Sequence, residues 1–155
     1  MSTRGLVAIR LNGLLRGVYS RYDSYPSFLG AKVVLSIKDA LLPFQSKYKT
    51  VLCKNAKKVS WGNEDSLSLS PELLPYVLLP RALGLIHPDG AVREYHAKLN
   101  HLRDDANFLN DKLFCEWAYI LDLDSKQFTM ICGDLTTNWP LFDPPSVEQM
   151  DRVPR

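Results

Sequence analysis

The most constraining feature of this sequence is the dipeptide Asn12-Gly13 close to its start. It separates two apolar runs, residues 6–9 and 14–19. A type I′ hairpin turn needs positive φ at both central residues, and Asn and Gly adopt that geometry more readily than other residues do. The sequence therefore predicts a β-hairpin over Gly5–Tyr22.

A second hairpin is predicted near the other end of the chain, over Cys115–Gly133. Large apolar residues alternate with other residues on both sides of a polar turn at 124–126, as strands with one buried face require. The alternating residues are Trp117, Tyr119, Leu121 and Leu123 before the turn and Phe128, Met130 and Cys132 after it.

Two segments show helical rather than strand periodicity, with apolar residues at steps of three and four. The first contains Leu29, Val33, Ile37, Ala40 and Leu41, and the second contains Tyr95, Leu99, Leu102, Ala106, Leu109 and Leu113. Asp23 or Ser24 is expected to cap the first helix, Pro26 to lie in its first turn and Pro43 to end it. The second helix is expected over 93–113.

The remaining segments carry weaker signals. Val51–Cys53 is a candidate short strand in an irregular stretch, and prolines at 75 and 80 should interrupt a helical piece in the middle of the chain. Residues 134–155 contain four prolines and little apolar periodicity, which predicts an irregular tail.

This order of elements predicts an α+β fold, in which an antiparallel sheet collects both hairpins and helices cover one face. A chain of 155 residues has the size of one domain. We therefore expect a single α+β domain over 1–133, followed by the Pro-rich tail 134–155.

Several classes of protein are disfavoured by composition. There is no apolar run of membrane-spanning length and no leader-type cleavage site, so a soluble cytoplasmic protein without membrane contact is expected. The three cysteines, Cys53, Cys115 and Cys132, lack the spacing of a disulfide framework or zinc site. Nucleotide-binding and hydrolase signatures are also missing from the sequence, and no metal or cofactor is expected.

Charge is divided unevenly along the chain. Residues 1–60 carry eleven Lys and Arg against two acids, a net +9, whereas residues 61–155 carry eight against fifteen, a net −7. The densest basic run comprises Lys47, Lys49, Lys54, Lys57 and Lys58. Either the two halves fold together and partly neutralise each other, or the basic half attracts an acidic protein or a nucleic acid.

Three short segments resemble a family of short proteins from phage and microbial genomes. They are the start Met1-Ser2-Thr3-Arg4, the stretch Tyr22–Pro26 with Gly30, and Glu116–Asp124, which is similar to a family strand of the form EYAYxIDLD. Ser24 stands where the family usually has Gly in an Asp-Gly-Tyr-Pro turn. The resemblance implies a fold and a phage or microbial setting, and it brings no catalytic residues with it.

The candidate binding residues cluster where the first hairpin leads into the first helix. They are Arg16, Arg21, Asp23, Tyr25 and Pro26, with the lysine run as an electrostatic contributor. Loops between strands and helices often present side chains to ligands. The alternative is structural: Asp23 caps the helix, Tyr25 packs and Pro26 fixes the turn.

Two groups could support catalysis instead. Removal of the initiator Met would leave the Ser2 hydroxyl beside a free α-amine, the arrangement of N-terminal-nucleophile amidohydrolases. Asp122 and Asp124 could form a carboxylate pair, although acids on an exposed strand end before a turn are the simpler explanation.

We therefore expect a small accessory protein that binds a macromolecule, in the first place another protein, without catalysis. The alternatives are an amidohydrolase that uses Ser2 and a nucleic-acid-binding protein that uses the basic half.

Overall fold

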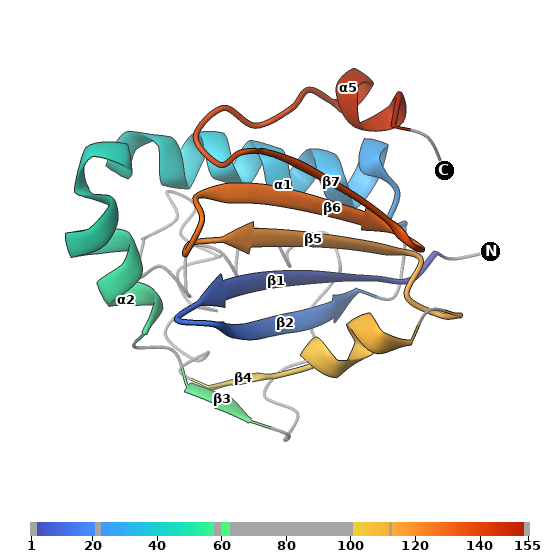
Figure 1. Ribbon diagram of the computed structural model, residues 1–155, viewed down its shortest axis with the longest axis horizontal. Helices are drawn as coiled ribbons and strands as arrows, with labels where there is room; N and C mark the ends of the chain where they lie inside the picture. The colour runs from blue at the N-terminus through green and yellow to red at the C-terminus, as the bar shows by residue number, and fades with distance from the viewer. Residues whose placement is uncertain (1–2, 21–22, 58–59, 63–100, 112, 154–155) are drawn as a thin grey trace, which may run out of the picture.

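A computed structural model describes residues 3–20, 23–57, 60–62, 101–111 and 113–153 of the chain. Its central feature is a five-stranded sheet with strand order β2-β1-β5-β6-β7 (Figure 1). The strands of this sheet are β1 (Gly5–Leu11), β2 (Leu14–Ser20), β5 (Trp117–Asp122), β6 (Gln127–Cys132) and β7 (Leu135–Pro140). A separate parallel pair is formed by β3 (Ser60–Gly62) and β4 (His101–Arg103).

Both predicted hairpins and the α+β class are confirmed. Asn12 and Gly13 have φ of 54° and 76°, the positive values that the tight turn between β1 and β2 requires. The pairs β5/β6 and β6/β7 are antiparallel as well. The two hairpins meet through β1 and β5, which pair in parallel. The sheet is therefore mixed, although mostly antiparallel.

The first predicted helix is confirmed as the start of a longer helical arm, which we define as residues 26–57. The arm consists of η1 (Pro26–Gly30), α1 (Ala31–Ser36), η2 (Ile37–Leu41), η3 (Leu42–Lys47), η4 (Tyr48–Cys53) and α2 (Lys54–Ala56). Leu29, Val33, Ile37 and Leu41 are at most 2% exposed, as their spacing predicts. Figure 1 shows the arm running along the strands and then bending around one end of the sheet.

Three local predictions about this arm are wrong. Pro43 does not end the helical structure, because it occupies the first turn of η3, where a missing N–H costs nothing. Val51–Cys53 is helical, since three apolar residues fit either element and helical turns continue on both sides. Neither Asp23 nor Ser24 caps the arm; Tyr25 takes the N-cap position without a side-chain bond.

Ser24 is instead a buried anchor between the hairpin and the arm. Its N–H donates to Thr3 Oγ1 at 2.7 Å, and its carbonyl oxygen accepts from the Tyr119 hydroxyl at 2.7 Å. Gly5 lies so close that a Cβ there would be 2.7 Å from Ser24 Cβ. The positive φ of this turn falls on Asp23, at 46°, so Ser24 does not need the freedom of glycine.

The predicted helix over 93–113 is wrong for the part that the structure describes. His101–Arg103 form strand β4, and Ala106–Asn110 form a short 3-10 helix, η5. The helical spacing of Leu102, Ala106 and Leu109 is overridden by tertiary contacts, because Asp104 and Asp105 bond to the edge of β2. Residues 93–100 lie outside the described part of the chain.

The predicted irregular tail is also wrong. Residues 135–140 form the edge strand β7, and Val147–Asp151 form the helix α5. Ser146 and Gln149 make a capping box at the start of α5. Leu141 and Met150 are fully buried in the main core, so the domain extends through these residues instead of ending at 133.

Both faces of the central strands β1 and β5 are buried. The helical arm covers the first face, where Val7, Tyr119, Leu121 and Phe128 pack against the arm's apolar stripe. The second face contains a smaller cluster of Leu6, Ala8, Cys115, Ala118 and Ile120, with Phe108 and Leu109 of η5 packed beside it. The arm meets the expectation of helices on one face, and the short helix η5 packs on the other face as well.

Candidate functional site

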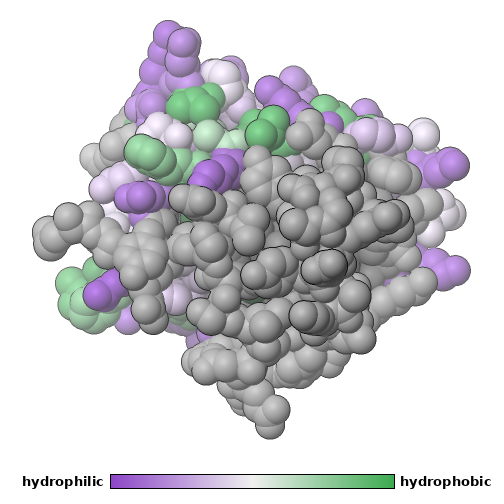
Figure 2. Space-filling model, turned by 180° about the vertical axis from the view of Figure 1, so that it is seen from behind, coloured by the Kyte–Doolittle hydropathy of each residue, from purple (hydrophilic) through white to green (hydrophobic). Residues whose placement is uncertain are grey.

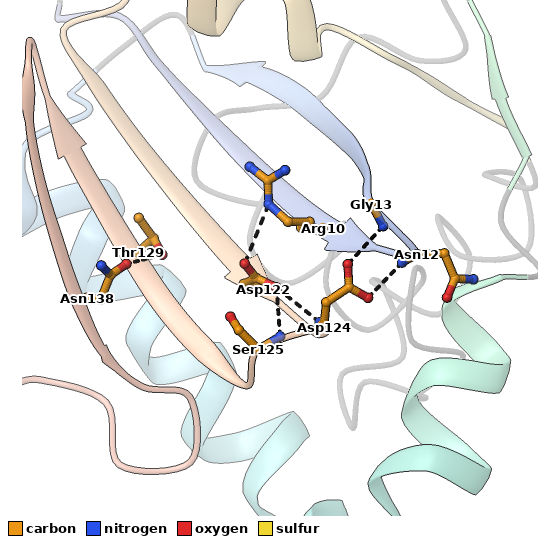
Figure 3. Close-up of polar contacts among 8 residues, drawn as sticks. All are labelled: Arg10, Asn12, Gly13, Asp122, Asp124, Ser125, Thr129 and Asn138. Atoms are coloured by element: carbon orange, nitrogen blue, oxygen red, sulfur yellow. Dashed lines mark hydrogen bonds and ion pairs between the residues drawn. The ribbon is translucent and has the colours of Figure 1, made fainter.

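Asp124 joins the two hairpin turns at the end of the sheet. Its carboxylate oxygens accept the N–H of Asn12 at 2.7 Å and the N–H of Gly13 at 2.9 Å (Figure 3). These two bonds, with that of Gly13 the stronger influence, lower the pKa of Asp124 below its usual value. The carboxylate therefore holds together two turns more than a hundred residues apart in sequence.

Asp122 shapes its own turn and also contacts β1. Its Oδ1 accepts the N–H groups of Asp124 and Ser125, both at 3.0 Å, and its Oδ2 lies 3.5 Å from Arg10 Nε. Figure 3 shows both carboxylates directed toward these partners. Asp122 and Asp124 thus act as turn acceptors, and the simpler of the two sequence-based explanations is the better one.

Acid should weaken this end of the sheet. A folded-state pKa below the usual 3.8 means that ionised Asp124 stabilises the fold above that pH, and that this contribution is lost as pH falls through the lower value. We expect Asp124→Asn to lower the melting temperature at pH 7, with a difference from the unmodified chain that shrinks in acid. Thermal melting at pH 7 and near pH 3 measures this.

Asp134 provides the matched control, because it is exposed and lies in the β6–β7 turn at the other end of the sheet. Asp134→Asn should leave the melting temperature almost unchanged at both pH values. Equal destabilisation by Asp124→Asn at pH 7 and pH 3 would contradict the assigned role of the carboxylate.

Arg16, a candidate binding residue, is engaged inside the fold. Its Nη1 donates to Asp104 Oδ2 at 2.7 Å, and Asp104 Oδ1 accepts the N–H groups of Gly17 at 3.2 Å and Ala106 at 3.0 Å. Asp104 also belongs to the acidic half, so the two halves of the chain partly neutralise each other here. Arg16 therefore stabilises the sheet edge through its bond to Asp104 and is not a free cation.

The strand-to-helix turn contains one exposed, one half-buried and one buried candidate. Asp23 is exposed, and its carbonyl oxygen accepts the N–H of Leu29 at 3.2 Å. Tyr25 is half-buried, and Pro26 is buried at the start of η1. Pro26 therefore positions the turn, whereas Asp23 and Tyr25 remain on the surface.

The lysine run lies on the helical arm. Lys47, Lys49, Lys54 and Lys57 are all exposed, and none forms an ion pair with another residue in the described ranges. Three acids of the second half, Asp104, Asp122 and Asp124, bond to Arg16, Arg10 and backbone amides instead. Lys58, Arg21 and Ser2 lie outside the described residues.

Sequence reasoning missed an apolar stripe on the outer surface of the arm. Phe28 is 51% exposed and Leu35 is 44% exposed, and the Tyr25 ring centroid lies 5.9 Å from that of Phe28. Figure 2 shows hydrophobic and hydrophilic surface interspersed along the top of the molecule, where Figure 1 draws both the arm and the segment that leads to α5. The signal was present in the sequence, because Phe28 and Leu35 are out of phase with the buried stripe.

The end of the arm packs on the turn of the second hairpin. Lys126 Nζ lies 4.8 Å from the centroid of the Tyr48 ring, and that ring meets Phe142 edge-on at 5.9 Å. Burial raises the pKa of the Tyr48 hydroxyl, with Cys53 as the next cause, so Tyr48 stays neutral. Cys115 is buried, and Cys53 and Cys132 are half-buried.

No family model, curated protein or solved structure matches this chain. Among the described residues, no helix is long and apolar enough to cross a bilayer. The same residues contain no group of three or more side chains arranged to hold a metal ion.

Proposed function

We propose that this protein acts by binding another protein through the outer surface of the helical arm. The observation that carries the proposal is the exposure of Phe28 and Leu35 on an arm whose other side is fully used by the core. Large apolar side chains on the outside of an otherwise satisfied helix are typical of contact surfaces.

The charge of the arm indicates which partner would fit. The arm carries six lysines, at 32, 38, 47, 49, 54 and 57, and one acid, Asp39. The described lysines of the predicted run keep their charge unpaired with other described residues, so an acidic partner would be attracted to them. We infer a partner protein with an apolar centre that meets Tyr25, Phe28 and Leu35 and an acidic rim that meets the lysines.

The phage or microbial setting of this activity rests on the sequence resemblance alone. Nucleic-acid binding by the same lysines is the second hypothesis, favoured by the exposure of four of them on one arm. The exposed Leu35 favours protein over nucleic acid, because an aliphatic side chain neither bonds to phosphate nor stacks on a base, whereas the ring of Phe28 fits either partner. The Ser2 hypothesis gains no supporting observation, because Ser2 is outside the described residues.

The test is affinity capture from nuclease-treated and untreated host extract with the full chain as bait. We expect a protein partner that survives nuclease and is captured at least tenfold less by a Phe28→Ser, Leu35→Ser double variant. Both side chains are about half exposed, so the variant should melt close to the unmodified chain.

Leu113→Ser is the matched control, since Leu113 is 78% exposed but lies on the loop before β5. It should capture the partner as well as the unmodified chain does. Capture that is indifferent to the Phe28 and Leu35 changes would refute the surface. Loss of all bound material on nuclease treatment, with steep weakening by salt, would establish the nucleic-acid hypothesis instead.

A further inference from the structure

The two edges of the five-stranded sheet differ in whether another segment bonds to their outward backbone groups. At the β2 edge, the outward N–H groups of Gly17 and Tyr19 donate to Asp104 Oδ1 and Asp105 Oδ2, both at 3.2 Å. The carbonyl oxygen of Gly17 also accepts the N–H of Asp105 at 2.8 Å. A neighbouring segment thus covers this edge and blocks strand addition there.

The β7 edge lies at the opposite side of the sheet (Figure 1). The bond from Leu141 N–H to the Lys126 carbonyl oxygen, with the antiparallel register, directs the N–H and C=O groups of Thr136 and Asn138 away from β6. No backbone bond joins these outward groups to another residue in the described ranges. Both residues are exposed, and β7 carries no charged residue that would repel a strand.

We propose that β7 pairs antiparallel with β7 of a second copy of this chain, about a two-fold axis at Thr137. In this register Thr136 of each copy lies opposite Asn138 of the other. Each of these two pairs exchanges both N–H···O=C bonds, which gives four backbone bonds. Every outward amide of β7 is then satisfied.

Side chains support the same register. On the helix-covered face, Leu135, which is 43% exposed, lies opposite the half-buried Trp139 of the second copy. On the other face, the Thr129 hydroxyl donates to Asn138 Oδ1 at 2.6 Å. Figure 3 shows the Asn138 amide nitrogen on the side away from Thr129, where it can donate to the Thr136 hydroxyl of the second copy.

The pairing closes at two copies. Pro140 has no N–H to extend the ladder, so the contact ends at the turn after β7. The remaining edge of each copy, β2, is covered by Asp104 and Asp105. A dimer of this kind leaves neither edge of the five-stranded sheet open for fibre growth.

Sedimentation equilibrium of the full chain over a range of concentrations tests the proposal. We expect a species of twice the 17.6 kDa chain mass at high concentration. A Thr136→Lys, Asn138→Lys double variant, which places like charges opposite each other, should remain monomeric. Gln127→Lys is the matched control, because Gln127 is exposed on the neighbouring strand β6 but has no outward backbone group, and it should still dimerise.

Cysteine cross-linking tests the register itself, in a chain with Cys53 and Cys132 replaced by serine. The two copies of residue 137 form a pair without backbone bonds, with Cα atoms about 4.5 Å apart, which suits a disulfide. Thr137→Cys should therefore give a disulfide-linked dimer on mild oxidation, and Thr136→Cys should not.

Two results would overturn the proposal: a monomer at the highest attainable concentration, or a dimer that is indifferent to the paired lysine substitutions. Efficient linking through position 136 and not 137 would also do so. The helical arm takes no part in this contact, so the failure of this proposal and the failure of the proposed function are separable.

Discussion

Replacement of Tyr119 by alanine should remove a large part of this protein's free energy of unfolding. Tyr119 is fully buried, its ring stacks near Phe128 at 6.3 Å, and its hydroxyl donates to the Ser24 carbonyl oxygen at 2.7 Å. Removing a buried aromatic ring leaves a cavity, and the expected loss is about 3–5 kcal/mol. Chemical denaturation measures this as a fall in the free energy of unfolding.

Two further variants test the hydroxyl of Tyr119 and the packing of its ring against the arm. Tyr119→Phe keeps the ring and leaves the Ser24 carbonyl oxygen unsatisfied, at a cost of about 1–2 kcal/mol. Gly30→Ala places a Cβ 2.9 Å from Tyr119 Cε1 and should cost about 1–3 kcal/mol by overpacking.

The cost of Gly30→Ala should diminish when Tyr119 is already alanine, because the ring that the new methyl group meets has gone. Additive costs in that double-mutant cycle, or a Tyr119→Ala variant as stable as the unmodified chain, would show that this contact does not hold the arm to the sheet.

Replacement of Asp104 by alanine has the second largest expected effect. Its carboxylate accepts from Arg16 and from the N–H groups of Gly17 and Ala106, and its side chain is 16% exposed. Losing the only acceptor that these groups have among the described residues should cost about 2–3 kcal/mol. Thermal and chemical unfolding measure the loss.

Arg16→Gln separates the ion pair from the backbone bonds. The side chain of Arg16 is 43% exposed and screened by solvent, so this variant should cost at most about 1 kcal/mol. A larger cost for Arg16→Gln than for Asp104→Ala would reverse the assignment. Asp104→Ala should also expose the β2 edge and increase association beyond the dimer, which light scattering would detect.

The bond between Arg16 and Asp104 also changes what is expected of Arg16 as a binding residue. The sequence places it among free cations near the strand-to-helix turn, and a charge reversal there would be expected to leave the melting temperature unchanged. Its 2.7 Å bond to Asp104, eighty-eight positions away, means that Arg16→Glu disturbs the fold as well as the surface. No local pattern in the sequence predicts that Asp104 is the partner of Arg16.

The candidate contact surface could be predicted in part. The sequence predicts a binding site at the turn with Asp23 and Tyr25, because strand-to-helix loops present side chains, and the structure leaves Asp23 exposed and Tyr25 half-buried. Phe28 and Leu35 are not among the predicted contact residues, although they fall outside the buried helical stripe. The predicted stripe places both residues on the other side of the helix, but only the tertiary structure shows that this side is left exposed.

Local interactions explain what the sequence by itself determined. Asn12-Gly13 specifies a turn through the φ values it accepts, alternation specifies the strands at 117–122 and 127–132, and the spacing of Leu29, Val33 and Ile37 specifies one buried helix face. Each depends on residues within a few positions of one another, so each can be deduced without knowing the rest of the fold.

Only the tertiary structure decided how these pieces meet. The parallel pairing of β1 with β5 joins residues more than a hundred positions apart, and the edge strand β7 forms in a Pro-rich segment because β6 offers it backbone partners. Asp104 and Asp105 leave a helical pattern because the amides of β2 need acceptors. Long-range hydrogen bonding, which has no period in the sequence, thus determined which sheet edge is covered and which is open.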